Sequence, residues 1–536
     1  MRRPLATLLI LVALIGGACQ RTQEPKREPA AKPDLNATVR IAAAEDQWPG
    51  PESGPGVKSD HFAYPLNMNV HDTLIILASD YSLKPGLAES WELIEPSTWR
   101  FHLRKGVKFH NGQPFTADDV VWTWGERMAQ GQTVDTISST LGYGDKPPRP
   151  WQEAVKKIDE YTVDFIPKSP NLRLPEQIVH PEGSIVPKGM HLEQGVGAGP
   201  FKLVEYKAKE SGVFERYDDY WGPKAKVKRI EVRFLPDPQT RIEALKAGQV
   251  DLILDVPQDA VSTLEDRFRI VRSKPGRNQL IYIKRNPRPD SPFNLGADKT
   301  VRQAVALALD NNTYVDTALE GEAEPGRWMA PASVLGKSAE LVKAPKRNLT
   351  RAREVLEAAG WKAGGDGIRV KDGRRLSLTI IGWAEIADAS FQVIQAQLKE
   401  AGIEVTIKKS ADQAAYSAYR TATEFDLNLE FPNQNDGNPA FLPVLRFYSK
   451  NATAAPYAPA GEFDTWAEKA LAAKTRDEVQ KASAEMMRIL EEQEFIVVPV
   501  AGVYRIYAMT KDVNLEDSHP SQSNQRWVTL SKITSS

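Results

Sequence analysis

The chain has 536 residues, of which 41% are hydrophobic, and this is enough for several domains with sizeable cores. Its 69 Lys and Arg residues are balanced by 70 Asp and Glu residues, so the formal net charge is -1 and nucleic acid, which attracts strongly cationic surfaces, is not an expected partner. A single cysteine excludes an internal disulfide framework, a cysteine-rich zinc site and an iron–sulfur cluster.

The first residues have the order of an export signal. Arg2 and Arg3 precede an apolar run over residues 5–15, and small residues then lead to Cys19. The run is short for a membrane-spanning helix. Because it ends at the only cysteine, the segment 1–19 resembles a bacterial lipoprotein signal, in which Cys19 is lipidated and becomes the mature N terminus. The alternative is an ordinary signal peptide with Cys19 incidental, and both predict an exported protein.

A polar tether is expected to precede the folded body. Residues 20–37 are rich in Gln, Glu, Lys, Arg and Pro and contain almost no large apolar side chain, which is typical of a flexible segment. A short strand is predicted at residues 38–42. Further on, Trp99, Phe101 and Leu103 alternate with polar residues, the pattern of a strand with one buried face.

The next local signals predict a turn and then a helix. Asn111 and Gly112 both tolerate a positive φ and are typical of a turn. Thr116 and Asp119 have the spacing of a capping box, in which each side chain accepts a hydrogen bond from a backbone amide at the start of the helix. We therefore expect a helix to begin directly after Thr116.

Helices and strands alternate through the middle of the chain. Asp237 and Pro238 begin a helix that leads into a strand at residues 250–254. Asp298 precedes another helix, and Thr350 precedes a shorter one. This alternation is typical of α/β proteins.

The same pattern continues toward the C terminus. A strand at 376–381, a helix at 389–401 and a strand at 403–407 form a βαβ unit, whose strands should pair in parallel. A long amphipathic helix over 477–494 then leads into an apolar strand at 496–500. The whole pattern predicts an α/β protein with several lobes.

Motifs for catalysis, metals or nucleotides are not readable in the sequence. The seven histidines lack metal-ligand spacing, and no Gly-x-Ser-x-Gly or Ser-x-x-Lys motif is present. Gly336 begins a Gly-Lys-Ser triplet, but Pro331 stands where a phosphate loop has its first glycine. Residues 195–200 lack dinucleotide-binding spacing and are expected to form a tight backbone passage between lobes. No enzymatic activity, cofactor or metal is expected.

Several stretches together resemble one family, the family 5 extracellular solute-binding proteins, which are the substrate-binding lipoproteins of peptide/nickel-type ABC importers. The most specific match is a block of 22 residues that contains the capping box described above. The matching stretches occur in family order and are PGLAESW (85–91), WRFHLRKGVKFHNGQPFTADDV (99–120), GAGPFKL (197–203), DYWG (219–222), residues 241–251 and VRQAVALALD (301–310).

The resemblance implies a three-lobed α/β fold of the periplasmic-binding-protein type (type II, cluster C), with the ligand in a cleft between two lobes. Lobes I and III are expected to close on the ligand, and a membrane permease complex would recognise the closed form. Hinges are expected at 195–200, 274–276 and 498–502. The expected boundaries are 38–75, 196–275 and 500–536 for lobe I, 76–195 for lobe II and 276–499 for lobe III.

The resemblance also indicates a ligand-contacting segment in lobe III. Peptide-binding relatives carry a Trp-x-Ala-Asp-Tyr-x-Asp-Pro-like segment whose first acidic residue pairs with the α-ammonium of a peptide. The matching stretch here is FPNQNDGNPAFL, residues 431–442. Anchored on Pro439, the alignment puts Asn435 at the acidic position and displaces Asp436 by one residue.

Three interpretations of this stretch remain open. If Asp436 faces the ligand, it can hold an ammonium group through a charge-assisted hydrogen bond. If Asn433, Gln434 and Asn435 face it, their neutral donors and acceptors suit sugars or amides. The third alternative is a loop that is simply rich in turn-forming residues.

Three tryptophans are further candidates for ligand contact. Trp383 directly follows a predicted strand and can stack on a sugar or on an aromatic side chain, although packing against a helix is an equal alternative. Trp48 and Trp328 are candidates on the same grounds. The site residues predicted from the sequence are thus Trp48, Trp328, Trp383, Asn433, Gln434, Asn435 and Asp436, with Cys19 as the lipidation site.

The leading functional hypothesis is a monomeric importer receptor for oligopeptides. The protein would be anchored to a membrane by its N-terminal lipid, at the periplasmic or cell-surface side, with an ABC permease as its partner. An oligosaccharide or another polar solute is the alternative ligand. A lipoprotein that uses the same fold for sensing, adhesion or chaperone-like holding is the second hypothesis, and a secreted hydrolase, which no motif supports, is the third.

Overall fold

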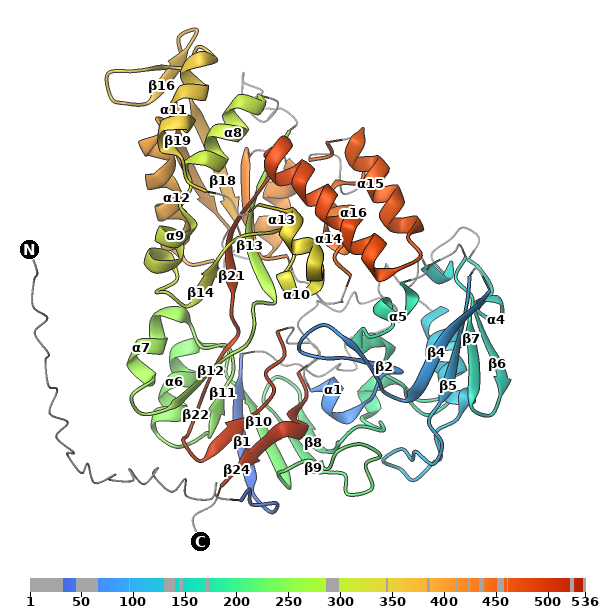
Figure 1. The fold of residues 1–536 in the computed structure, drawn as a ribbon. Coiled ribbons are helices and arrows are strands. Elements are labelled where there is room, and N and C mark those ends of the chain that lie inside the picture. Colours follow the sequence, from blue (N-terminus) through green and yellow to red (C-terminus); the bar gives the residue numbers. More distant parts are fainter. Residues whose placement is uncertain are drawn as a thin grey trace, which may run out of the picture.

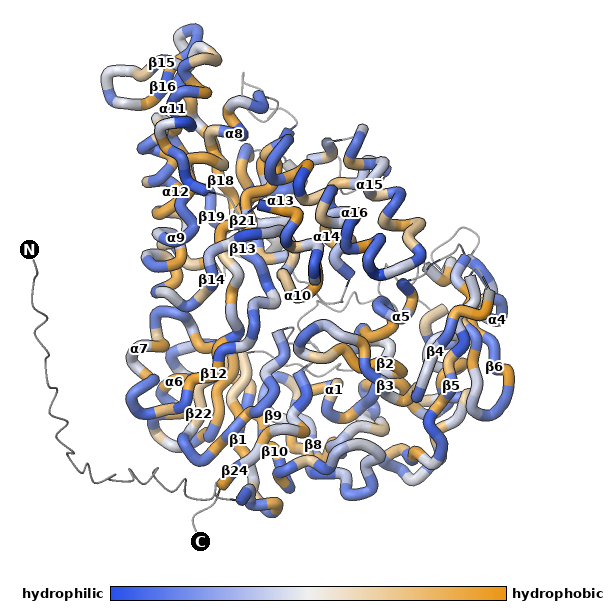
Figure 2. The backbone as a smooth tube through the Cα atoms, in the orientation of Figure 1, coloured by the Kyte–Doolittle hydropathy of each residue, from blue (hydrophilic) through white to orange (hydrophobic). Residues whose placement is uncertain are grey.

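Three parts, each built on its own β-sheet, make up the folded chain (Figure 1). Figure 2 shows apolar residues concentrated in the strands, while the surface helices alternate between polar and apolar along their length. The computed structural model describes residues 32–44, 66–95, 97–129, 140–143, 148–168, 171, 173–285, 298–343, 346–382, 386–410, 413–422, 425–432, 438–450, 457–459, 461–520 and 525–533.

Lobe I is built on a seven-stranded sheet with the order β12-β22-β11-β1-β10-β9-β8. Its central strand β1 pairs in parallel with both β10 and β11, and most of the buried residues of these strands belong to one core. Helices α6 (Pro238–Lys246) and α7 (Val261–Leu264) belong to a second apolar cluster of this lobe. The strands are β1 (Thr38–Ala43), β8 (Phe201–Lys207), β9 (Ser211–Arg216), β10 (Arg229–Phe234), β11 (Leu252–Ile253), β12 (Arg269–Arg272) and β22 (Ile506–Met509).

Lobe II contains a four-stranded antiparallel sheet with the order β4-β5-β7-β6. The capping box is confirmed, because the Thr116 side chain accepts from the Asp118 amide and Asp119 accepts from the Thr116 amide. The elements are β4 (Ala88–Glu95), β5 (Thr98–Leu103), α2 (Ala117–Val121), the π-helical turn η1 (Trp122–Arg127), α4 (Trp151–Ala154), β6 (Val155–Asp159), β7 (Thr162–Phe165) and α5 (Leu174–Gln177).

Lobe III is built on a six-stranded sheet with the order β14-β21-β13-β20-β18-β19. The predicted βαβ unit is confirmed, since β18 and β19 pair in parallel and α12 connects them. The strands are β13 (Arg277–Ile283), β14 (Ala323–Pro325), β18 (Ser377–Gly382), β19 (Glu404–Lys409), β20 (Leu427–Glu430) and β21 (Val497–Val503).

Helices cover both faces of this six-stranded sheet (Figure 1). One apolar cluster joins the sheet to α8, α9, α11 and α12, and a second joins it to α14, α15 and α16. The main helices are α8 (Lys299–Ala308), α9 (Asn311–Ala318), α10 (Ala332–Leu335), α11 (Leu349–Ala358), α12 (Asp388–Glu400), α13 (Gln413–Ala422), α14 (Phe441–Phe447), α15 (Glu462–Ala472), α16 (Arg476–Arg488) and the π-helical turn η7 (Ile489–Gln493).

Smaller elements complete the described part of the chain. They are α1 (Asn67–Val70), β2 (Ile75–Leu77), β3 (Leu83–Pro85), η2 (Pro181–Gly183), η3 (Leu192–Gln194), η4 (Gln258–Ala260), η5 (Gly336–Leu341), β15 (Lys362–Ala363), β16 (Arg369–Lys371), β17 (Arg374–Arg375), β23 (Val513–Leu515), η9 (Trp527–Thr529) and β24 (Leu530–Lys532). The segment before β1 contacts the last strand, because the Asp34 amide donates to Lys532 O of β24.

One predicted helix start and one predicted lobe boundary need correction. Helix α11 begins two residues before the predicted start, because the Asn348 side chain, and not Thr350, accepts the hydrogen bond from a first-turn amide, that of Arg351. The predicted boundary after residue 499 falls inside β21, which stays in the six-stranded sheet to Val503. The other lobe boundaries stay predictions.

Two short linkers join the sheets of lobes I and III. Residues 273–276 connect β12 to β13, and residues 504–505 connect β21 to β22. The linkers are bonded to each other, since the Ser273 amide donates to Arg505 O at 2.9 Å and the Arg505 amide donates to Ser273 Oγ at 3.0 Å. The second expected hinge, 274–276, therefore lies in a linker. The third, 498–502, lies within β21, and the chain passes from lobe III to lobe I only after that strand, at residues 504–505.

The glycine-rich stretch passes closely beside α1. A Cβ atom at Gly197 would lie 2.1 Å from Val70 O, and one at Gly199 would lie 2.7 Å from the same atom, so only glycine fits at either position. His110 also contacts this stretch, because its Nε2 forms a hydrogen bond with Gly199 O at 2.9 Å. This close approach explains the glycine spacing without a nucleotide.

Two buried histidines at this passage predict acid sensitivity. Burial lowers the pKa of His71 to about 3 and that of His110 to about 4. In the unfolded chain both histidines bind a proton near pH 6.5. The contribution of the two neutral histidines to folding stability is therefore complete above pH 6.5 and is lost as pH falls from 6.5 toward their folded-state pKa values. We expect the free energy of unfolding to drop by roughly 1.4 kcal/mol per pH unit for each group.

Urea unfolding between pH 7 and pH 4 measures this effect. His110→Gln should flatten part of the slope, whereas His102→Gln, at a half-exposed position in lobe II, should leave it unchanged. Equal slopes for all three proteins would contradict the assignment.

Candidate functional site

The parallel strands of lobes I and III direct their carboxyl ends toward the two linkers from opposite sides. In lobe I, β12 and β11 are both antiparallel to β22, so they run in one direction, and β12 leaves its sheet through the 273–276 linker. In lobe III, β20 is antiparallel to β13, which begins directly after that linker. Ligands of open α/β sheets bind beyond the carboxyl ends of such strands, so the facing edges define the candidate site.

Two predicted ligand segments start side by side at the lobe III edge. Strands β18 and β20 pair in parallel, with Gly382 opposite Leu429. Trp383 is the next residue after β18, and Asn433 follows β20 by three residues. The topology therefore starts both segments at adjacent strand ends, which the sequence alone does not reveal.

Most of the predicted site residues themselves lie outside the described ranges. This applies to Trp48, Trp383, Asn433, Gln434, Asn435, Asp436 and the lipidation candidate Cys19. Their roles stay predictions.

Trp328 is the one predicted contact within the described ranges. Its indole Nε1 donates to Val342 O at 3.1 Å, and its carbonyl accepts from Asn278 Nδ2 at 3.0 Å. The side chain is half-buried and packs against the second apolar cluster of lobe III. These contacts account for the indole without a ligand, and ligand binding by Trp328 stays a prediction.

A buried polar network lies where β20 ends. Glu430 is the last residue of β20 and is only 5% exposed. Its Oε2 accepts from the Tyr416 hydroxyl at 2.6 Å and from Asn428 Nδ2 at 3.3 Å. Its Oε1 lies 3.4 Å from Arg446 Nη2. Because Arg446 belongs to α14, this ion pair joins the two ends of the connection between β20 and α14.

The charge state of this network follows from its partners. Burial favours the protonated form of Glu430, but the guanidinium groups of Arg446 and Arg420 and the bond from Tyr416 outweigh it and lower the pKa of Glu430. Glu430 is therefore an anion whose oxygens are already bonded within lobe III. It can support the neighbouring segment but is not placed to bind a ligand cation itself.

An arginine that the sequence reasoning missed lies at the start of β13. The guanidinium of Arg277 lies 5.3 Å from the ring centre of Phe431, the residue directly after β20. A cation in this position brings positive charge to the edge from which the candidate ligand segment continues. No motif marks Arg277, since only the pairing of β13 with β20, which are far apart in sequence, brings it there.

The described residues contain neither a metal cluster nor a membrane-spanning helix. No group of three or more His, Cys, Asp or Glu side chains within them is placed to hold a metal ion. None of the helices in these ranges combines the length and the apolar composition needed to cross a bilayer.

Three sheets, two linkers and facing carboxyl strand ends define a three-lobed α/β fold of the periplasmic-binding-protein type. Comparison with solved structures supports this class: NikA from Brucella suis in complex with Fe(III)-EDTA superimposes with a TM-score of 0.78 at 22% identity, covering 93% of this chain and 100% of that one. At this identity the likeness shows the fold alone.

Sequence comparison gives the family. The family model for bacterial extracellular solute-binding proteins, family 5 Middle, matches residues 82–454. The chain is 27% identical over 412 residues to the nickel-binding periplasmic protein of Escherichia coli (strain K12), covering 71% of this chain and 74% of that protein. It is 28% identical over 347 residues to the oligopeptide-binding protein AppA of Bacillus subtilis (strain 168), covering 60% of each.

The chain belongs to the family 5 extracellular solute-binding proteins. Members of this family are the solute-binding components of ABC importers and are not enzymes. The predicted family and fold class are therefore confirmed.

Proposed function

We propose that this protein captures an oligopeptide by closure of lobes I and III and delivers it to a membrane permease. The observation that carries the proposal is the parallel pairing of β18 with β20, which starts the Trp383 and 433–436 segments at adjacent strand ends facing lobe I. A ligand that contacts both lobes stabilises the closed state by its differential affinity for that state. The match to an oligopeptide-binding relative agrees with this ligand class.

The proposal also includes a lipid anchor at Cys19 and an alternative class of ligand. Cys19 would carry the lipid that holds the exported protein at the membrane. If the amides of Asn433, Gln434 and Asn435 contact the ligand, the preferred solute is an oligosaccharide or another polar molecule.

Mass spectrometry of the gently purified protein, compared under native and denaturing conditions, tests the ligand class. A series of released peptide masses would support an oligopeptide receptor. A single non-peptide mass would contradict it and favour the polar-solute alternative.

Asp436→Asn tests whether this carboxylate holds a peptide N terminus. We expect the affinity for peptides with a free α-ammonium to fall about ten-fold or more, because a charge-assisted bond is lost, while N-acetylated peptides bind unchanged. Calorimetry measures both affinities. Asp259→Asn, at an exposed position in lobe I, serves as the control, and equal losses for both peptide types would contradict the ammonium pairing.

A further inference from the structure

The connection between β20 and α14 contains a buried asparagine turn. Asn438 is 2% exposed, and its Oδ1 accepts from the Ala440 amide at 2.9 Å. Its carbonyl accepts from the Phe441 amide at 3.2 Å, so this one residue forms the turn that begins α14. Whatever holds the Asn438 side chain therefore also sets the direction in which the chain enters the helix.

A residue of lobe II holds this turn. The guanidinium of Arg173 donates from Nη1 to Asn438 Oδ1 at 2.5 Å, although the two residues are 265 positions apart in the chain. Arg173 is itself 9% exposed, so the bond is shielded from water. A charge-assisted bond in such a place is stronger and more directional than one at the surface.

Two further contacts join the same parts of lobes II and III. Glu176, on the short helix α5 that follows Arg173, lies 4.0 Å from Arg476 at the start of α16. Val334 of α10 packs within the apolar core of lobe II. In Figure 1, α5 lies next to one end of α16. Arg173 thus acts within a real interface and not as an isolated contact.

We propose that Arg173 is a positioning residue for ligand binding, which fixes the Asn438 turn from lobe II and couples the contact between lobes II and III to occupancy of the ligand site. This inference rests on the proposed function, because Asn438 stands two residues after Asp436, the last of the candidate ligand residues in this segment. Within lobe III the Glu430–Arg446 ion pair joins the end of β20 to α14. Arg173 of lobe II binds the Asn438 turn in the connection between these two elements. Coupling of this kind is reciprocal, so ligand binding must strengthen the interface as much as the interface strengthens binding.

Hydrogen exchange of the ligand-free protein tests the positioning directly. In Arg173→Ala the amides of Ala440 and Phe441 should exchange at least ten-fold faster, because the turn loses its outer support. Arg173→Lys keeps a donor and should restore much of the protection. Arg149→Ala is the matched control, since the Arg149 guanidinium contacts lobe II, through the carbonyls of Ile166 and Glu153 and an ion pair with the Glu153 carboxylate. Unchanged exchange in Arg173→Ala would overturn the proposal.

Calorimetry with trialanine as the probe tests the coupling to ligand binding. Arg173→Ala and Asn438→Ala should each weaken binding about ten-fold, and the double variant should bind no more weakly than either single variant. Asn438→Asp keeps the acceptor and should retain affinity. Wild-type affinity in Arg173→Ala, or fully additive losses, would overturn the coupling. If neither trialanine nor any peptide released from the purified protein binds the wild-type protein, the peptide hypothesis fails, and the exchange experiment still decides the positioning role.

Discussion

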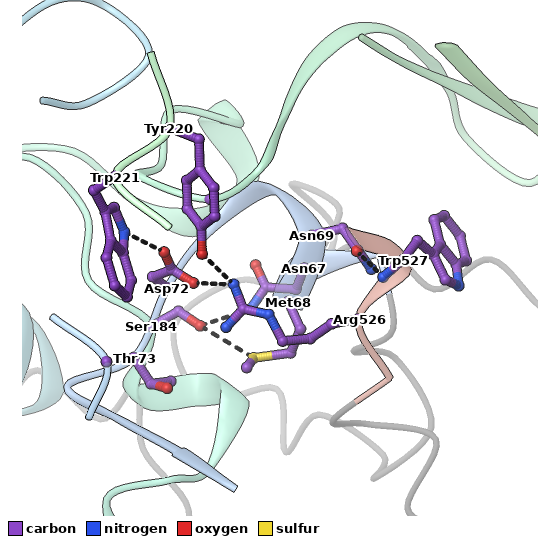
Figure 3. A network of polar contacts seen from close by, with 12 residues as sticks. Asn67, Met68, Asn69, Asp72, Thr73, Ser184, Tyr220, Trp221, Arg526 and Trp527 are labelled. Atoms are coloured by element: carbon purple, nitrogen blue, oxygen red, sulfur yellow. Dashed lines mark hydrogen bonds and ion pairs between the residues drawn. The ribbon is translucent and has the colours of Figure 1, made fainter. Parts of the chain in front are cut away.

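Asp72→Asn is expected to lower the free energy of unfolding by about 3–5 kcal/mol, because it leaves the Arg526 guanidinium buried without a counter-charge. Asp72 is fully buried, and its Oδ1 accepts from Arg526 Nη2 at 2.5 Å. Its Oδ2 accepts from Trp221 Nε1 at 2.7 Å, and Arg526 Nη2 also donates to the Tyr220 hydroxyl at 2.8 Å. Figure 3 shows the carboxylate between the indole and the guanidinium.

Equilibrium urea unfolding measures this loss. The double variant Asp72→Asn/Arg526→Met should be more stable than Asp72→Asn alone, since it removes the unpaired charge as well. Asp118→Asn is the control, because Asp118 pairs with Lys157 and both side chains are exposed, and such an ion pair contributes less than about 1 kcal/mol. A similar loss for Asp72→Asn and Asp118→Asn would contradict the prediction.

This network ties three distant parts of the chain together. Arg526 lies 454 positions after Asp72, and the neighbouring Trp527 amide donates to Asn69 Oδ1 at 2.6 Å. Asn67, on the same short helix as Asn69, donates from Nδ2 to Ser184 Oγ of lobe II at 3.2 Å. The last strands of the chain are thereby fixed at the junction of lobes I and II (Figure 3).

Local elements could be predicted from the sequence because their signals are local. The capping box at Thr116 and Asp119, and the βαβ unit that ends in β19, depend on residues within a few turns of each other. The start of α11 was missed by two residues because Asn348 and Thr350 are both good capping residues, and sequence alone does not choose between them.

The candidate site could be predicted only in part, because its contacts are long-range. Arg277 reaches Phe431 through the pairing of β13 with β20, and Arg173 reaches Asn438 across two lobes. Neither arginine lies in a motif, and a charged residue in a polar stretch is ordinarily a solvated surface residue. The family resemblance pointed to the segment after β20, but it carried no information on the residues that hold this segment in place.

Arg446→Met is expected to destabilise the protein by about 3–5 kcal/mol at pH 8, because Glu430 then remains buried with neutral partners and only the more distant charge of Arg420. In the wild-type protein the lowered pKa of Glu430 contributes stability that is complete above the ordinary carboxyl pKa and is lost as pH falls through the folded-state value. In the variant the pKa of Glu430 should rise, so protonation relieves the buried charge. The difference in stability between the two proteins should therefore shrink as pH is lowered from 8 to 4.

Urea unfolding at both pH values measures the stability gap, and the double variant Glu430→Gln/Arg446→Met separates its causes. The double variant should recover much of the stability lost in Arg446→Met, because no buried anion remains, and its stability should depend less on pH. Arg351→Met, which breaks an exposed pair with Glu354 on α11, should change stability by about 1 kcal/mol or less. A gap that is the same at pH 8 and pH 4 would show that Glu430 is not the group responsible. If instead the gap closes at pH 4, the connection between β20 and α14 is held by a buried charge pair, and peptide affinity should fall with it in Arg446→Met.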